Sequence, residues 1–258
     1  MRRQAHMQAP GGIRVRKNSD MSSLNVRRLA ILVVCLAVGL LFWDSPLLWP
    51  LKVLVVMIHE TGHAVASLLV GGSVDSISVS GNEGGQCLSR LPDSSLGAIV
   101  VYSAGYVGSA LVGGVLLLST YRYRARRWML GAAAGWLVVM ALLYGRDLFT
   151  IAFCLGTAAV LALAARFLPV ELVDVVNLFL AAFCALYAVF DLRSDLWDGA
   201  TRAQSDAALL ARITYVPAIA WAALWTAASL AILGAFLWRA LRSPARPVAP
   251  LAVARARG

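Results

Sequence analysis

Two histidines and a glutamate lie close together in an otherwise apolar stretch, VVMIHETGHAVASLL, at residues 55–69. On a helix, residues four apart share one face, so His59 and His63 can direct two imidazole nitrogens at one ion. Zinc takes nitrogen and oxygen ligands, and its catalytic sites combine three protein ligands with a water molecule. The metal lowers the pKa of that water, and a neighbouring glutamate can accept its proton. We therefore predict one Zn²⁺ per chain, with His59 and His63 as ligands and Glu60 as the catalytic base.

The third ligand must come from elsewhere in the chain. The remaining histidine, His6, lies in a polar N-terminal tail, so a carboxylate is required. Asp191 is the first choice, because it stands where an apolar run stops and an acidic segment begins. Asp195 and Asp206 in the same segment follow, and Asp147 in the turn YGRDLF comes last.

The elements that carry these residues are long apolar runs. The chain has 258 residues, of which 60% are hydrophobic and 14% are charged. A membrane-spanning helix needs about 20 mostly apolar residues. Candidate spans are 29–43, 51–70, 96–118, 128–144, 149–167, 175–190 and 215–238. We predict an all-α polytopic membrane protein with six to seven transmembrane helices. Residues 26–240 would form one membrane-embedded domain between a disordered basic N-terminal tail (1–25) and a basic C-terminal tail (241–258).

Ionisable groups inside such a span need an explanation, because a charge at the bilayer centre costs about 2.5–3.5 kcal/mol on insertion scales. A metal site at these residues would explain their presence in the span. Two alternatives are a hydrogen-bonded polar cluster that joins helices without a metal, and a site that has lost its activity.

Two segments flank the second and third spans. Residues 71–92 alternate in SISVS and turn at GNEGG, which predicts a short β-hairpin beside the active-site helix, although a plain polar loop would also fit. In the next span, Gly105, Ser109 and Gly113 recur at spacing four and make a flat helix face. That face suits helix packing in general and also a helix pressed against an active site.

The net charge of +10 is placed at the two tails and in YRYRARR at 121–127. That distribution is typical of membrane topology signals, and no nucleic-acid-binding module is visible. We expect the lipid bilayer as a partner, no nucleic acid, and a multi-pass protein of a bacterial plasma membrane with a cytoplasmic N-terminus. With seven crossings, 121–127 and the C-terminal tail would fall outside. With six crossings, and one of the first three runs not crossing, all three basic regions would fall inside.

The segments HETGHAVASLLVGG and SAGYVGSALVGG, with the predicted hairpin between them, resemble the site-2 protease family of intramembrane zinc metallopeptidases. YAVFDLRSD and SDAALLAR look like a bacterial and plant subgroup of that family. The resemblance implies a zinc peptidase that cleaves membrane-anchored protein substrates, as in regulated intramembrane proteolysis, with Glu60 as the base. It also implies that the hairpin receives substrate as an added strand. In this sequence that role falls on Ser76, Ile77, Ser78, Val79 and Ser80.

The sequence also departs from the family pattern. Better-known members supply the third ligand from an Asn-Pro-Asp-Gly-like or Leu-Asp-Gly motif, and the nearest equivalent here is Asp198-Gly199 in LWDGA. An inactive membrane scaffold that keeps the protease fold is therefore the alternative function. A transporter would predict inverted repeats, and none is evident.

Overall fold

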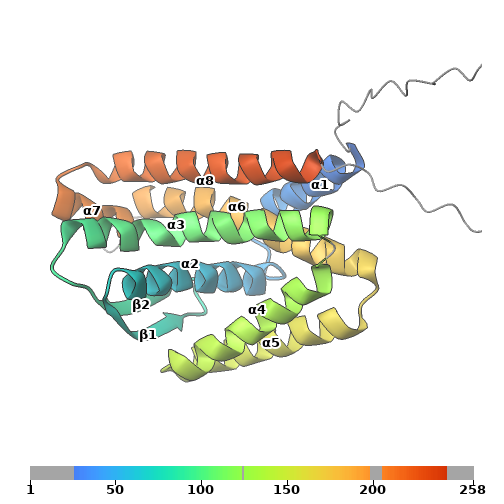
Figure 1. Cartoon of the computed structure of the whole chain (residues 1–258), viewed down its shortest axis with the longest axis horizontal. Coiled ribbons are helices and arrows are strands. Elements are labelled where there is room, and N and C mark those ends of the chain that lie inside the picture. The colour runs from blue at the N-terminus through green and yellow to red at the C-terminus, as the bar shows by residue number, and fades with distance from the viewer. Residues whose placement is uncertain (1–25, 124, 198–204, 243–258) are drawn as a thin grey trace, which may run out of the picture.

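The computed structural model describes residues 26–123, 125–197 and 205–242, and within these ranges the side chains of 27–28, 122–123 and 188–197 are excepted. The predicted tails, apart from residues 241–242, and Asp198-Gly199 lie outside this description. The described chain forms eight α-helices, one short π-helical turn and one two-stranded sheet (Figure 1). In chain order they are α1 Val26–Leu41, α2 Trp49–Leu69, β1 Ser73–Val79, β2 Gly85–Arg90, α3 Ser95–Leu118, η1 Ser119–Tyr123, α4 Arg126–Leu143, α5 Leu148–Phe167, α6 Val170–Trp197, α7 Asp206–Thr214 and α8 Ala218–Leu241.

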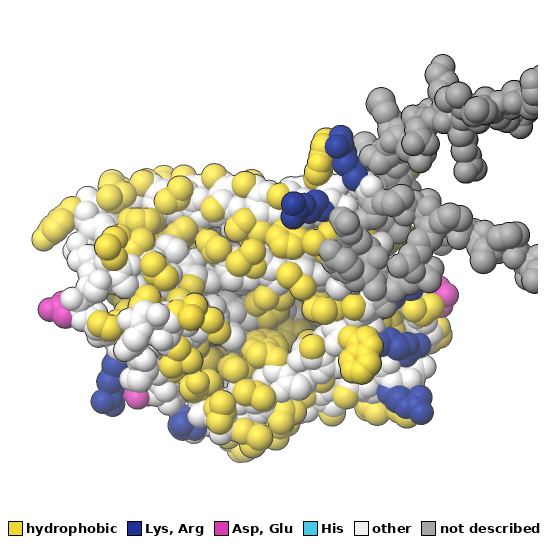
Figure 2. Space-filling model, in the orientation of Figure 1, with side chains coloured by type: hydrophobic (Ala, Val, Ile, Leu, Met, Phe, Trp, Pro, Cys, Tyr) yellow, Lys and Arg dark blue, Asp and Glu magenta, His cyan; other side chains and the backbone are white. Residues whose placement is uncertain are grey.

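Six of the described helices are long and apolar enough to cross a membrane: α2, α3, α4, α5, α6 and α8. Many large apolar side chains on them are exposed, including Leu142 and Val160. Figure 2 shows apolar side chains spread over the visible face of the bundle. Lipid can cover such a surface, whereas water would penalise it. The prediction of a mostly helical protein with six to seven spans and a hairpin is confirmed.

The first apolar run forms α1, which has 16 residues and is shorter than the six spans. Its last turn packs on the middle of α6: a Cβ on Gly39 would lie 2.7 Å from Leu186 Cδ1. Trp43, just beyond α1, stacks on Phe183 with ring centroids 5.7 Å apart. A helix of this length rises about 24 Å. The six candidate spans equal in number the crossings of the alternative in which the first run does not cross.

The helices α2, α3, α6 and α8 form the centre of the bundle. Helix α3 contacts α2, α6 and α8, and Gly62 and Gly113 allow close approach along it. An added Cβ on Gly62 would collide with the backbone of Ala104, and one on Gly113 would lie 3.0 Å from Cys184 Cβ. Small residues at such crossings let helix backbones come close together.

The hairpin is antiparallel, with Ile77 opposite Cys87 and Val79 opposite Gly85. It packs along α2, and its turn is fixed to the start of that helix. Trp49 Nε1 donates to the Gly81 carbonyl (2.7 Å), and Lys52 pairs with Glu83 (2.7 Å). The strands therefore run beside the helix that carries the histidines, as predicted.

Candidate metal centre

His59, Glu60 and His63 lie on consecutive turns of α2, and all three are buried. Their exposed fractions are 5%, 7% and 6%. Spacing by four places the two imidazole rings on one face, with ring centroids 4.7 Å apart. The helix thus presents both rings in the same direction, away from solvent.

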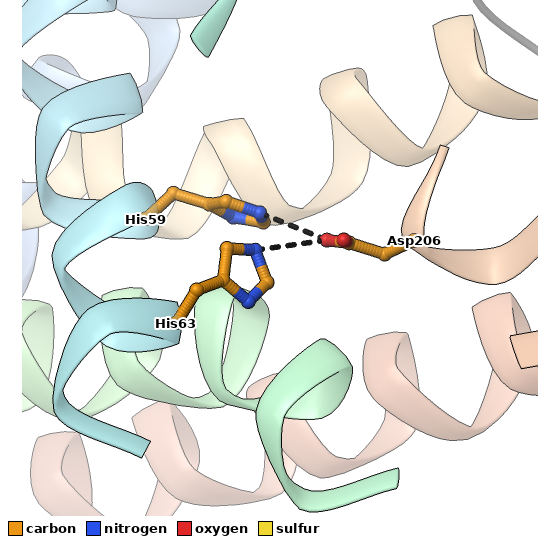
Figure 3. Close-up of side chains that lie close together, drawn as sticks. All are labelled: His59, His63 and Asp206. Carbon is orange, nitrogen blue, oxygen red and sulfur yellow. Dashed lines mark hydrogen bonds and ion pairs between the residues drawn. The ribbon is translucent and has the colours of Figure 1, made fainter. Parts of the chain in front are cut away.

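The carboxylate of Asp206 faces both rings (Figure 3). Its Oδ2 lies 3.1 Å from His59 Nε2 and 3.1 Å from His63 Nε2. Asp206 is the first residue of α7, whose start is capped by Ser205: the Ala208 N–H donates to Ser205 Oγ (3.3 Å). Among the described residues, these three side chains form the one group that could hold a metal ion through three ligand atoms.

His63 is oriented by a second hydrogen bond. Its Nδ1 lies 2.7 Å from the Val101 carbonyl oxygen, which can only accept, so Nδ1 carries the proton. In its neutral form the ring presents its Nε2 lone pair to Asp206, and in its protonated form it offers the carboxylate a positive charge. A lone pair and a carboxylate at 3.1 Å repel each other unless a proton or a cation lies between them. The donor set and its geometry therefore fit a bound cation such as Zn²⁺, whose histidine ligands commonly donate their other nitrogen to a carbonyl.

Apart from the contact of its Nε2 with Asp206, His59 is positioned by packing. Its Nδ1 is buried and has no hydrogen-bond partner in the described part of the chain. The ring meets the edge of Tyr106 at a centroid distance of 4.6 Å. Opposite it lies Gly105, where an added Cβ would come within 2.5 Å of His59 Cε1. The space for this imidazole thus exists because position 105 has no side chain.

Asp206 is held ionised by its two neighbours. Burial of the carboxyl acts to raise its pKa, but the charge of His63, with the hydrogen bonds to both rings, outweighs burial and holds the pKa well below its usual range. A carboxylate that stays charged is the form that binds a metal.

Glu60 lies between the two histidines and strand β2. A Cβ on Gly85 would stand 2.5 Å from Glu60 Oε1, so this glycine leaves the room that the carboxylate uses. Cys87, two residues on, also lies near the site. Burial, followed by the charges of Glu60 and Asp206, raises the pKa of its thiol to about 12. Strand β2 is therefore the strand of the hairpin that borders the candidate base.

The outer edge of β1 is not free, contrary to the expectation for Ser76, Ile77, Ser78, Val79 and Ser80. The Ile77 N–H donates to the Tyr144 carbonyl (3.0 Å), and the Val79 N–H donates to Thr150 Oγ1 (2.9 Å). The turn between α4 and α5 therefore occupies this edge. In an antiparallel pair, the residues opposite Ile77 and Val79 point their backbone groups to the other side. That places the backbone groups of Cys87 and Gly85 on the outer edge of β2.

The other predicted ligands have different surroundings. Asp147 caps α5 by accepting from the Thr150 N–H (2.8 Å), and it does not belong to the histidine group. Asp191 and Asp195 lie in α6, which continues to Trp197, so the expectation that Asp191 opens a loop is wrong. Their side chains are outside the described set, and their roles as ligands stay predictions. Asp206, ranked below Asp191, is the carboxylate that the described structure brings to His59 and His63.

The sequence did not predict a role in the site for three contributors: the Val101 carbonyl, Gly85 and Gly105. A backbone carbonyl leaves no residue-type signal. Gly105 was noted only as part of a small-residue face, and its use as space for His59 depends on the pairing of α2 with α3.

Six candidate spans around a buried pair of histidines and a carboxylate define the class of multi-pass membrane proteins with a metallopeptidase-like site. The chain belongs to the Peptidase M50B-like family, whose model matches residues 31–236, and this places it among the site-2 proteases. The match covers the six spans almost entirely and includes all three members of the histidine–carboxylate group. No curated protein and no solved structure matches the chain.

Proposed function

We propose that this protein is an intramembrane zinc metalloprotease that hydrolyses peptide bonds of membrane-anchored proteins. The observation that carries the proposal is the convergence of His59 Nε2 and His63 Nε2 on one carboxylate oxygen of Asp206, each at 3.1 Å, with Glu60 buried beside them. A zinc ion held by these three residues would supply Lewis acidity and lower the pKa of a bound water.

Glu60 would act as the base. It follows His59 directly and lies between the histidines and β2, where a substrate backbone could approach. Its carboxylate would take a proton from the attacking water and pass it to the amine that leaves when the peptide bond breaks. Burial in a bundle that excludes bulk water strengthens these charge interactions.

Substrate would bind along the outer edge of β2. A peptide bond within a helix has its backbone groups already paired, so a helical substrate must unwind before water can attack. An unwound segment can pair with a strand edge through main-chain hydrogen bonds. The edge carrying Gly85 and Cys87 borders Glu60, whereas the edge of β1 is occupied by the α4–α5 turn. Substrate would thus still bind as an added strand, but at the edge of β2 and not at the SISVS edge of β1.

The alternative of an inactive scaffold draws no support from the described site, which has two imidazoles, a carboxylate and a buried glutamate in place. We place the active protein in a bacterial plasma membrane with its N-terminus in the cytoplasm, in keeping with the basic N-terminal tail.

The test compares Glu60→Gln with Glu171→Gln. Glu171 is exposed in the first turn of α6 and serves as the matched control. The purified variants are assayed for zinc content and for cleavage of a single-span reporter protein tagged at both ends. We expect Glu60→Gln to keep zinc and lose cleavage by at least about 100-fold, because the amide cannot accept the proton. Glu171→Gln should match the wild type. Wild-type protein without zinc, or a Glu60→Gln variant with wild-type cleavage, would contradict the proposal.

A further inference from the structure

A buried lysine stands in the first half of α2, before the histidines. Lys52 is 6% exposed, and its Nζ lies 2.7 Å from Glu83 Oε1 in the hairpin turn. The same Nζ lies 5.4 Å from the ring centre of Trp43, just beyond α1. A charged group inside a membrane span is costly unless it has partners, and such residues commonly serve a function. Lys52 is therefore a candidate for a role outside the metal centre itself.

Glu83 holds a backbone conformation that favours glycine, with a φ of +67°. Glycine adopts this conformation without strain, whereas other residues do so at a cost. The Ser80 N–H donates to the Gly84 carbonyl (2.9 Å), and the Glu83 N–H donates to the Ser80 carbonyl (3.1 Å). The turn itself thus uses only the backbone of position 83. What the glutamate side chain adds is the contact with Lys52, which ties the turn to α2.

Both strands of the hairpin pack on α2 (Figure 1), and the contacts of β2 follow one face of that helix. Lys52, Val56 and Glu60 are spaced by four and share this face. Lys52 pairs with Glu83. Further along, a Cβ on Gly85 would collide with Val56 Cγ1 and stand 2.5 Å from Glu60 Oε1. The helix rises about 6 Å from Lys52 to Val56, and two residues of extended chain span at most about 7 Å. The two contacts therefore match in spacing, so a shift of β2 along α2 would break the ion pair.

We propose that the Lys52–Glu83 ion pair fixes the register of β2 along α2 and thereby selects which peptide bond of a substrate lies beside Glu60. The selection rests on the proposed protease function, in which substrate adds to the outer edge of β2. Backbone pairing places each substrate residue opposite a particular residue of β2, so substrate would move together with the strand. A displacement of about 1 Å from the reacting geometry can cost about 100-fold in rate. Lys52 and Glu83 are thus positioning residues that act through β2.

Two single variants remove the ion pair from its two sides. Lys52→Met keeps an unbranched apolar side chain and removes the charge. Glu83→Gly removes the carboxylate and at the same time relieves the backbone at this position. Lys52→Arg keeps a cation that can pair with Glu83. Arg90→Met is the matched control, because the Arg90–Asp75 pair (3.0 Å) also belongs to the hairpin but joins its two strands to each other.

Backbone hydrogen exchange of residues 80–88 in detergent-solubilised protein reports on the hairpin without reference to catalysis. We expect exchange about tenfold faster in Lys52→Met and Glu83→Gly, because a hydrogen bond between charged groups is lost. Lys52→Arg should match the wild type, and so should Arg90→Met, because an exposed ion pair contributes little. If position 83 served the turn conformation alone, Glu83→Gly would slow exchange or leave it unchanged. Unchanged exchange in either Lys52→Met or Glu83→Gly would overturn the proposal. An equal increase in Arg90→Met or in Lys52→Arg would do the same.

Mass spectrometry of the fragments of the single-span reporter then maps the bonds that are cleaved. We expect Lys52→Met and Glu83→Gly to keep zinc, to raise KM and to cut bonds next to the one that the wild type prefers. Faster exchange with an unchanged distribution of cleaved bonds would overturn the selection of the bond. Absence of cleavage by the wild type would remove the protease function and with it that selection, whereas hydrogen exchange would still decide whether the ion pair holds β2.

Discussion

His59 and Asp206 are 147 positions apart in the chain, and their Nε2 and Oδ2 atoms are 3.1 Å apart. The contact depends on the packing of α7 against α3 and α8, both of which α7 contacts. A buried carboxylate directed at two imidazoles is costly unless it has counter-charges, and a metal ion supplies them. This relationship makes Asp206 the carboxylate to test first.

Asp206→Ala should lose bound zinc and proteolysis together. Outer-shell partners of a metal typically contribute about 10–100-fold to affinity, and a direct ligand should cost more than that. The measurement is the zinc dissociation constant, with cleavage assayed in parallel.

Asp147→Ala is the matched control for that variant. It removes the cap of α5, which should cost about 1 kcal/mol of stability and leave zinc in place. Asp191→Ala and Asp195→Ala test the ranking made from the sequence. Full zinc content in Asp206→Ala together with zinc loss in Asp191→Ala would restore the original ranking.

Gly105→Ala should displace the His59 ring and weaken zinc binding, because the new methyl group would stand 2.5 Å from Cε1. Gly108→Ala on the same helix is the control, since its Cβ would meet Gly62 Cα at an ordinary 3.5 Å. Both changes favour helix formation by about 1 kcal/mol, so helix propensity does not separate them. The zinc content of the two purified variants is compared. Equal zinc content would contradict the role assigned to Gly105.

Cys87→Pro should raise KM or block cleavage while zinc stays bound. At this position the backbone N–H points to the outer edge of β2, so proline removes a donor offered to substrate and spares the pairing with β1. Cys87→Ala controls for the thiol and should cleave normally. Gln86→Pro removes a donor that points toward β1 and should destabilise the hairpin itself. Unchanged KM in Cys87→Pro would count against strand addition at this edge.

Removal of the metal should lower the thermal stability of the wild type more than that of Asp206→Ala. A ligand that binds only the folded state stabilises it by about 2.7 kcal/mol at a hundredfold excess over its dissociation constant. The measurement is Tm before and after treatment with a chelator, followed by addition of zinc. If the wild-type Tm changes neither with the chelator nor with added zinc, the protein holds no stabilising metal.

The sequence determined the features that depend on local geometry. The spacing of His59 and His63 fixes a shared helix face wherever the helix lies, and the turn residues at GNEGG fix a hairpin between two short strands. The apolar runs determined the helical spans, because backbone groups in lipid must be paired within the segment. The match of residues 31–236 to a peptidase family agrees with the motif at residues 59–63.

Only the tertiary structure decided which distant residues meet. The apolar run stops near Asp191, but the helix continues to Trp197 because no glycine or proline interrupts α6. Several acids follow one another in the sequence, and among the described side chains the packing of α7 against α3 and α8 brings Asp206 to the two histidines. In the same way, the alternation in SISVS shows a strand and cannot show which edge is open. The structure shows that the α4–α5 turn covers the edge of β1. Such a contact between remote segments depends on how the helices pack, and a local sequence pattern contains no information about that packing.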